Sequence, residues 1–219
     1  IQFSEHIPQV EGSIDGIDGV FDIDTGSRSS LTIAAPFAEA NKLADKYHAS
    51  AEVIIGAGVG GPARARLARG TLLKLGAVDV PQPVTLLSTA TSGAFADPTL
   101  AGNVGFGVLH RFNLVFDYRN EVIWFEKNAA FGDKDVHDRA GVWVERGKGG
   151  FTVVDVLAGG PAAQAGLKAG DVVKSVDGKP AARVTLDALR ARFKDAPGSK
   201  VRLTLVNGHA VTITLKDLI

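Results

Sequence analysis

Hydrophobic and polar positions in the first half of the chain follow the pattern of β hairpins. Between residues 7 and 33, short apolar stretches alternate with the pairs Asp15-Gly16 and Asp18-Gly19. Asp-Gly pairs readily supply the positive φ angles that tight turns need. Further strands are predicted over residues 52–55, 63–75, 78–87, 114–118 and 122–125. We therefore expect a mainly β fold for this half.

One segment of this half has the spacing of a helix. Pro36 suits the first position of a helix, where its missing N–H costs no hydrogen bond. The apolar residues that follow recur at helical intervals, namely Phe37, Ala40, Leu43, Ala44 and Tyr47. The sequence therefore predicts a single helix over residues 36–47.

A change of pattern separates a second domain from the first. Residues 127–139 are polar and lack periodicity, which is typical of a domain boundary. Beyond this segment we predict an amphipathic helix with Thr185 as its N-cap, and a final hairpin around Asn207-Gly208. The other elements predicted here are strands at 141–145, 151–157 and 172–176 and a short helix at 161–165. The chain is thus divided into domains 1–130 and 140–219, the second a small α/β domain.

Composition and charge exclude several functions. Hydrophobic residues make up 45% of the chain, enough for buried cores. The 24 basic residues balance the 24 acidic ones, so we expect no nucleic-acid partner. Cysteine is absent, which rules out disulfides and thiol catalysis, and the apolar runs are far shorter than the roughly 20 residues of a membrane-spanning helix. Methionine is absent even at position 1, so we expect that an upstream segment has been removed.

A carboxylate ends one of the apolar strands, in the stretch Phe21-Asp22-Ile23-Asp24-Thr25-Gly26-Ser27. This stretch resembles the Asp-Thr-Gly active-site turn of retropepsin-like aspartic proteases. The family's second signature, an apolar pair and a glycine before a short helix and a strand, resembles residues 103–109 and 112–118. Asn103 departs from it, because an aliphatic residue is more usual there, and so does Gly107, where Asp or Asn is commoner.

The resemblance covers residues 5–127 and implies an acid-protease β-barrel lobe with Asp24, Thr25 and Gly26 as its catalytic turn. In such an enzyme two carboxylates about 3 Å apart share one proton, one acting as base on a water and the other as acid. By resemblance, Thr25 would brace its counterpart across a two-fold axis. The alternative is an ordinary strand-ending turn, since Asp, Thr and Gly all favour turns. The second signature, at the expected distance, favours the protease.

Only one Asp-Thr-Gly motif is present in the chain. Asp15, Asp18 and Asp177 precede glycine directly, without the hydroxyl residue between. The second carboxylate would therefore come from a homodimer partner, as in retroviral proteases, or from an upstream protease lobe, which we favour slightly.

The glycine-rich stretch from Gly56 to Gly61 permits two interpretations. Its G-x-G-x-x-G spacing would suit a dinucleotide site if a helix followed at once. Pro62 and an alternating, strand-like pattern follow instead. The resemblance implies a flap that closes over substrate, with glycines at its tip. The predicted flap residues are Gly56, Gly58, Gly60 and Gly61, and an ordinary flexible loop remains the alternative.

Residues 161–178 strongly resemble the PDZ domains of bacterial envelope proteases, and the match extends over about residues 140–219. PDZ domains bind an extended peptide as an added strand, while backbone N–H groups hold its terminal carboxylate. By resemblance, the carboxylate loop is Ala140, Gly141, Val142 and Trp143, and the helix beside the groove carries Leu186, Leu189 and Arg190. Alternatively, these leucines are core residues and Trp143 a packing residue.

Other chemistries find no support in the sequence. The five histidines show no H-x-x-x-H spacing, so no metal and no cofactor is expected. There is no G-x-S-x-G elbow, which disfavours a serine hydrolase. The leading hypothesis is an aspartic endopeptidase whose partners are a protein or peptide substrate and a peptide ligand of the PDZ domain. The rival is a non-catalytic docking protein. A periplasmic or envelope location is implied by resemblance alone.

Overall fold

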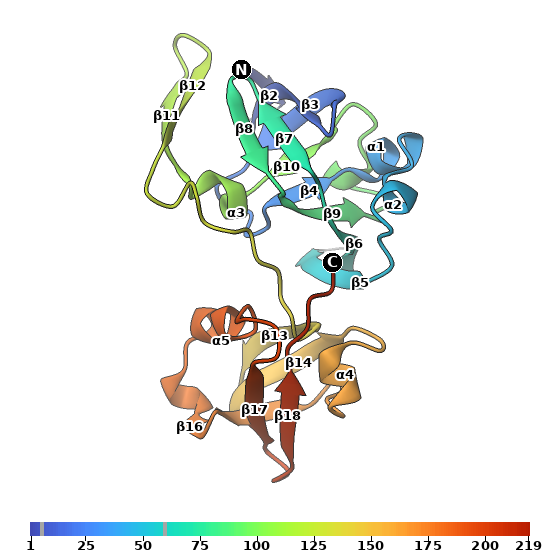
Figure 1. Ribbon diagram of the computed structural model, residues 1–219, viewed down its shortest axis with the longest axis vertical. Coiled ribbons are helices and arrows are strands. Elements are labelled where there is room, and N and C mark those ends of the chain that lie inside the picture. The colour runs from blue at the N-terminus through green and yellow to red at the C-terminus, as the bar shows by residue number, and fades with distance from the viewer. Residues whose placement is uncertain (5–6, 59–60) are drawn as a thin grey trace. The chain divides into compact units, whose positions relative to one another are not determined.

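A computed structural model describes residues 1–4, 7–58 and 61–219. The chain divides into two compact units (Figure 1). Unit 1 comprises Ile1–Asp135 together with Ile219, and unit 2 comprises Val136–Leu218. The change from one unit to the next falls within the polar segment 127–139. In the described residues, no helix is both long enough and apolar enough to cross a membrane.

Unit 1 is built mainly from strands. Its strands are β1 (Gln2–Ser4), β2 (Ile7–Ile14), β3 (Ile17–Ile23), β4 (Leu31–Ile33), β5 (Glu52–Gly58), β6 (Gly61–Arg69), β7 (Leu72–Leu75), β8 (Val78–Pro81), β9 (Val84–Ser88), β10 (Gly102–Val104), β11 (Phe112–Asp117) and β12 (Val122–Lys127). Its helices are α1 (Ala35–Ala40), α2 (Leu43–Lys46), the 3₁₀ turn η1 (Ala94–Ala96) and α3 (Phe106–Leu109). The expectation of a mainly β first half is confirmed.

The central sheet brings distant segments of unit 1 side by side. Its strand order is β5-β6-β9-β4-β10-β3-β2-β7-β8, with β1 added on β2. Strand β10 lies between β3, to which it is parallel, and β4, to which it is antiparallel. This insertion places the end of β10 beside the end of β3, where the Asp-Thr-Gly turn begins. Strands β11 and β12 form a separate antiparallel hairpin.

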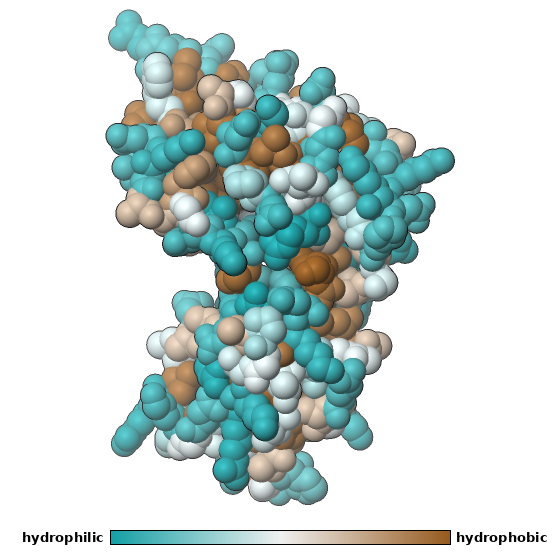
Figure 2. All heavy atoms as spheres, in the orientation of Figure 1, coloured by the Kyte–Doolittle hydropathy of each residue, from teal (hydrophilic) through white to brown (hydrophobic). Residues whose placement is uncertain are grey.

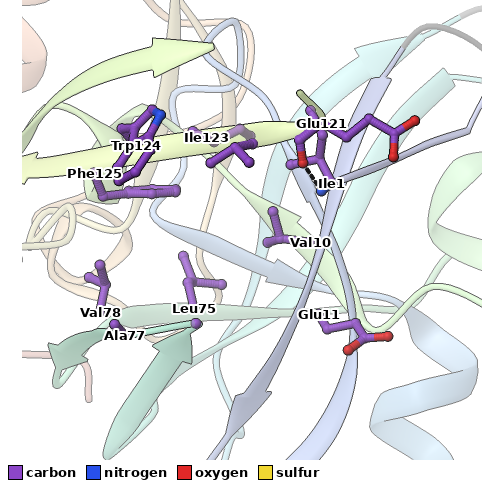
Figure 3. Close-up of a pocket in the computed structure, with 12 residues that line it drawn as sticks. Ile1, Val10, Glu11, Leu75, Ala77, Val78, Glu121, Ile123, Trp124 and Phe125 are labelled. Atoms are coloured by element: carbon purple, nitrogen blue, oxygen red, sulfur yellow. Dashed lines mark hydrogen bonds between the residues drawn. The ribbon is translucent and has the colours of Figure 1, made fainter. Parts of the chain in front are cut away.

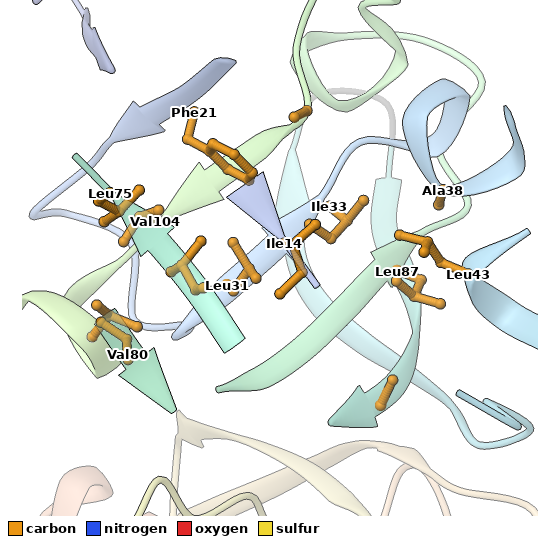
Figure 4. Close-up of a cluster of buried hydrophobic side chains, with 14 of the residues drawn as sticks. Ile14, Phe21, Leu31, Ile33, Ala38, Leu43, Leu75, Val80, Leu87 and Val104 are labelled. Carbon is orange, nitrogen blue, oxygen red and sulfur yellow. The ribbon is translucent and has the colours of Figure 1, made fainter. Parts of the chain in front are cut away.

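The core of unit 1 lies among the strands of this sheet (Figure 4). Phe21, Leu31 and Ile33 are fully buried there, and Val104 packs with them. Each of these strands therefore keeps its apolar side chains away from water, which is the main favourable contribution to folding. The Asp-Thr-Gly turn thus follows a strand whose apolar side chains lie in this core.

The predicted helix over residues 36–47 is wrong in one respect, because the chain forms two short helices there. Helix α1 ends at Ala40 and α2 begins at Leu43. Between them Lys42 has φ 50 and ψ 39, the left-handed conformation, which cannot continue a right-handed helix. Likewise, the single strand predicted over residues 63–75 is divided into β6 and β7.

Unit 2 is a small α/β unit, as expected. Its sheet has the order β13-β14-β15-β17-β18, with β16 beside β15. The elements are β13 (Val142–Gly147), β14 (Gly150–Val156), α4 (Pro161–Gln164), β15 (Val172–Val176), β16 (Lys179–Pro180), η2 (Ala181–Arg183), α5 (Leu186–Arg192), β17 (Lys200–Leu205) and β18 (Ala210–Thr214). The predicted N-cap is confirmed, since the Thr185 side chain accepts a hydrogen bond from the Ala188 N–H at 3.0 Å. The final hairpin turns at Gly208, with φ 91.

Candidate functional site

The Asp24 carboxylate stands at the end of β3, on a turn that its own oxygen stabilises. The Asp24 N–H donates to the carbonyl of Val104 at 3.0 Å, which fixes the last residue before the turn against β10. Asp24 Oδ1 accepts the backbone N–H groups of Gly26 at 2.8 Å and Ser27 at 3.1 Å. The carboxylate is therefore half-buried and held in one orientation relative to the sheet.

The second signature packs directly against this turn. The Phe106 N–H donates to the Ser27 carbonyl at 2.7 Å, and the Gly105 N–H donates to the Ser30 carbonyl at 3.0 Å. A Cβ at Gly105 would lie 2.3 Å from the Ser29 carbonyl oxygen, so only glycine fits there. The two motifs, about 80 residues apart in the sequence, thus form one hydrogen-bonded structure, as the order of strands requires.

Asn103, which departs from the family pattern, contacts the candidate catalytic group. Its Nδ2 donates to Asp24 Oδ2 at 3.1 Å, so the second carboxylate oxygen also has an N–H donor. The Asn103 side chain is only 6% exposed, and its Oδ1 has no hydrogen-bond partner among the described residues. The sequence could not assign this role, because only the insertion of β10 beside β3 brings Asn103 to Asp24.

A second acid, Asp22, lies two residues before Asp24 on β3 and is 6% exposed. Gln9 Nε2 on β2 donates to Asp22 Oδ1 at 2.8 Å. Burial raises the pKa of Asp22 above its usual range, and the nearby charge of Asp24 acts in the same direction, while the hydrogen bond from Gln9 lowers it. Two carboxylates, Asp22 and Asp24, therefore lie close to each other at the end of strand β3.

The rest of the predicted catalytic turn is open to solvent. Thr25 and Gly26 are both exposed. The described hydrogen-bond partners of the Asp24 carboxylate are all N–H donors. No group of three or more His, Asp or Glu side chains that could hold a metal ion occurs in residues 1–4, 7–58 and 61–219.

The predicted flap lies on the antiparallel hairpin of β5 and β6. Gly58 and Gly61 are paired across this hairpin, and a Cβ at Gly56 would have no heavy atom of the described part of the chain within 4 Å. Gly60 lies outside the described residues. The chain continues after Gly61 as a strand rather than a helix, so the dinucleotide interpretation is wrong.

In the loop that the sequence predicts to hold a terminal carboxylate, the backbone N–H groups donate to a side chain of the chain itself. Gly141 has φ 68, the left-handed conformation that turns the chain into β13. Asp138 Oδ1 accepts the backbone N–H groups of Ala140 at 2.9 Å, Gly141 at 2.6 Å and Val142 at 3.4 Å. Asp138 did not figure among the predicted site residues, although an Asp two residues before Ala-Gly is a turn signal.

The helix side of the predicted groove needs one correction. Leu189 is fully buried in the core of unit 2, so its side chain is not available to a ligand. Leu186 is partly buried against the same core. Arg190 Nη2 reaches the Val144 carbonyl on β13 at 3.4 Å, and its guanidinium lies 5.9 Å from the ring centre of Trp143.

A cavity of about 400 Å³ opens elsewhere in unit 1. Figure 3 shows Ile123 and Phe125 of β12 on one side of it and Leu75 and Val78 on the other, while Figure 2 shows hydrophobic residues around β7 and β8. Trp124 on the hairpin is 63% exposed. None of the predicted site residues lines this cavity.

Comparison with known proteins gives matches to parts of this chain. The family model of the PDZ domain matches residues 152–207, within unit 2, which confirms the expected PDZ domain. The periplasmic serine endoproteases DegP of Salmonella typhimurium and Escherichia coli K12 are 32% identical to this chain over 123 residues. That match covers 52% of this chain and 25% of the relatives, so the chain spans about a quarter of their length.

Among solved structures, a retropepsin-like aspartic protease from Rickettsia conorii is similar to this chain, with a TM-score of 0.39 and 13% sequence identity. The similarity covers 53% of this chain and 81% of that protein's chain.

Proposed function

We propose that unit 1 is one lobe of an aspartic endopeptidase, that Asp24 supplies one of its two catalytic carboxylates, and that the PDZ unit recognises peptides. The second carboxylate comes from another lobe, either in a second copy of this chain or in an upstream segment. The observation that carries this proposal is the fixed carboxylate of Asp24, with N–H donors on both oxygens and an accessible turn beside it.

The chemistry follows from two carboxylates that share one proton. The ionised carboxylate takes a proton from water as the water oxygen attacks the carbonyl carbon of the peptide. The protonated carboxyl gives its proton to the carbonyl oxygen, which forms a tetrahedral diol. As the C–N bond breaks, the carboxyl that took the proton from water gives it to the amine nitrogen, the other carboxylate takes a proton from one diol hydroxyl, and a carboxylic acid is left. The pair titrates as a unit.

The residues around Asp24 have positioning roles in this scheme. The Gly26 and Ser27 N–H groups hold Oδ1, and hydrogen bonds to the ionised form favour it. Asn103 holds Oδ2, and it does so from a buried position that leaves it little freedom to move. The flap hairpin β5–β6 closes over the substrate in this proposal.

The test is Asp24→Asn in a sample whose mass in solution has been measured, with a pool of random peptides as substrate. Asparagine keeps the acceptor oxygen for the turn but cannot exchange the proton, so peptide hydrolysis should fall about 10³-fold. Asp18→Asn, at an exposed aspartate of β3 away from the turn, is the matched control and should cleave normally. A dimeric sample that cleaves equally well after Asp24→Asn refutes the aspartic mechanism.

A second candidate function is peptide docking without hydrolysis, which the PDZ match at residues 152–207 favours. A monomer of this chain has a single Asp-Thr-Gly motif and cannot assemble the carboxylate pair. The test is a monomeric sample, alone and mixed with any upstream lobe. If it binds peptides and cleaves none in either case, docking is favoured over hydrolysis.

A further inference from the structure

The loop at the start of β13 has the form of an anion site. Ala140, Gly141 and Val142 direct three successive N–H groups at one oxygen atom, Asp138 Oδ1. Successive N–H groups around a left-handed residue, here Gly141, form a concave site that binds anions. In PDZ domains a site of this kind captures the terminal carboxylate of a peptide.

In this chain the oxygen in that site belongs to the chain itself. A carboxylate that accepts several N–H groups is held by charge-assisted hydrogen bonds, which are stronger than neutral ones. The three donors lie between 2.6 and 3.4 Å from Asp138 Oδ1. An incoming terminal carboxylate therefore needs the same N–H groups that Asp138 already uses.

The edge of the sheet beside this loop is the second feature on which the inference rests. Strand β13 is one of the two end strands of the sheet in unit 2, and its sheet partner is β14. An end strand offers a row of backbone groups to a further strand. One of them, the Val144 carbonyl, accepts a long hydrogen bond from Arg190 at 3.4 Å, which a peptide N–H could replace. The edge can thus take an extended segment while the anion site stays filled.

We propose that Asp138 is the specificity-determining residue of the PDZ unit, because its carboxylate fills the terminal-carboxylate site from within and leaves the β13 edge to internal extended segments. A free C-terminus binds only when Asp138 leaves the loop. This inference rests on the peptide recognition proposed for unit 2 and holds whether or not unit 1 is a protease.

The first test follows the loop directly, with acetate as the simplest carboxylate probe. The amide signals of Ala140, Gly141 and Val142 are recorded by NMR in the full chain at neutral pH during an acetate titration. In the unmodified protein the chemical shifts of these signals should not change. In Asp138→Ala they should shift saturably, since the three N–H groups have lost their acceptor. Asp171→Ala is the control. It removes another carboxylate of unit 2, which accepts the Lys168 N–H at 2.9 Å, and acetate should not shift the three amide signals in this variant.

Two outcomes of the acetate titration overturn the proposal. One is a loop that responds to acetate in the unmodified protein as strongly as in Asp138→Ala. The other is a folded Asp138→Ala protein, with the remaining signals of unit 2 unchanged, whose loop does not respond at all.

The second test can refute the proposal with the unmodified chain alone, even if Asp138→Ala does not fold. A pool of random heptapeptides is prepared with free C-terminal carboxylates and, separately, as carboxamides, and retention by the unmodified chain is compared. We expect equal retention of the two forms. In Asp138→Ala the free acids should be retained about tenfold better, the effect of one charge-assisted contact. A tenfold preference for free acids in the unmodified chain refutes the occupied site, and retention of neither form refutes the edge-strand part.

Discussion

Two aspartates of this chain make nearly the same local turn and end in different surroundings. Asp24 in unit 1 accepts the N–H groups of Gly26 and Ser27 on Oδ1, and Asp138 in unit 2 accepts those of Ala140, Gly141 and Val142. Such contacts between an Asp side chain and the backbone just after it are a local property of turns. The turn by itself therefore does not distinguish a reactive carboxylate from a structural one.

The difference lies in what the rest of each unit brings to the carboxylate. Asp24 receives a second donor on Oδ2 from Asn103, on a strand that lies far away in the sequence, and its turn faces solvent. For Asp138, burial raises the pKa to about 6, partly offset by the backbone N–H groups and by the charge of Lys194. One carboxylate is presented outward on a supported turn, and the other is turned into a loop of its own unit.

The largest expected effect comes from breaking the support of the Asp24 turn. In Gly105→Ala the new Cβ would meet the Ser29 carbonyl at 2.3 Å, so the backbone of the turn must move. We expect unit 1 to lose about 3 kcal/mol of stability and peptide hydrolysis to disappear with it. Chemical denaturation measures the first and a peptidase assay the second.

Gly56→Ala is the control for the stability measurement, because its Cβ would meet no atom of the described residues within 4 Å. The two glycines lie in the same unit, so their variants share the unfolding reaction being measured. If both variants lost equal stability, the close approach at Gly105 would not be the cause.

A smaller effect should appear in the pH dependence of unit 2. Because the pKa of Asp138 is raised in the folded chain, the folded state binds its proton more tightly than the unfolded state does. The resulting stability is fully present below about pH 4 and is lost as pH rises through about 6. Lys194 is the charged group that acts on Asp138 from outside the loop, and it opposes this shift.

Asp138→Asn tests whether the raised pKa of Asp138 causes this pH dependence, since asparagine keeps an acceptor oxygen in the loop and cannot titrate. The stability of unit 2, measured by denaturation at pH 4.5 and 7, should then change less with pH than in the unmodified protein. Asp171→Asn, which leaves the Asp138 carboxylate in place, serves as the control. An unchanged slope in Asp138→Asn contradicts the raised pKa.

The smallest expected effect concerns Asn103. In Asn103→Leu the residue more usual in the resembled family replaces the donor to Asp24 Oδ2. We expect about a tenfold lower hydrolysis rate, the value of one hydrogen bond to a charged group. An unchanged hydrolysis rate in a folded Asn103→Leu protein would contradict this role of Asn103.

The sequence by itself determined the local elements of this protein. Alternating apolar positions and the Asp-Gly and Asn-Gly pairs predicted most strands and turns, because hairpins depend on contacts within a few residues. The order Asp24-Thr25-Gly26 and the glycine at 105 marked the candidate site for the same reason. Where a local pattern failed, as in the helix interrupted at Lys42, the backbone had adopted a conformation that apolar spacing does not encode.

Only the tertiary structure decided what each aspartate contacts. The insertion of β10 between β3 and β4 gave Asp24 its partner Asn103, and strand pairing over such distances in the sequence leaves no local pattern. Folding likewise placed Leu189 in the core and turned Asp138 into its loop. Burial and long-range hydrogen bonds arise from the packing of whole elements, and they set the chemistry of a carboxylate more than its neighbours in the chain do.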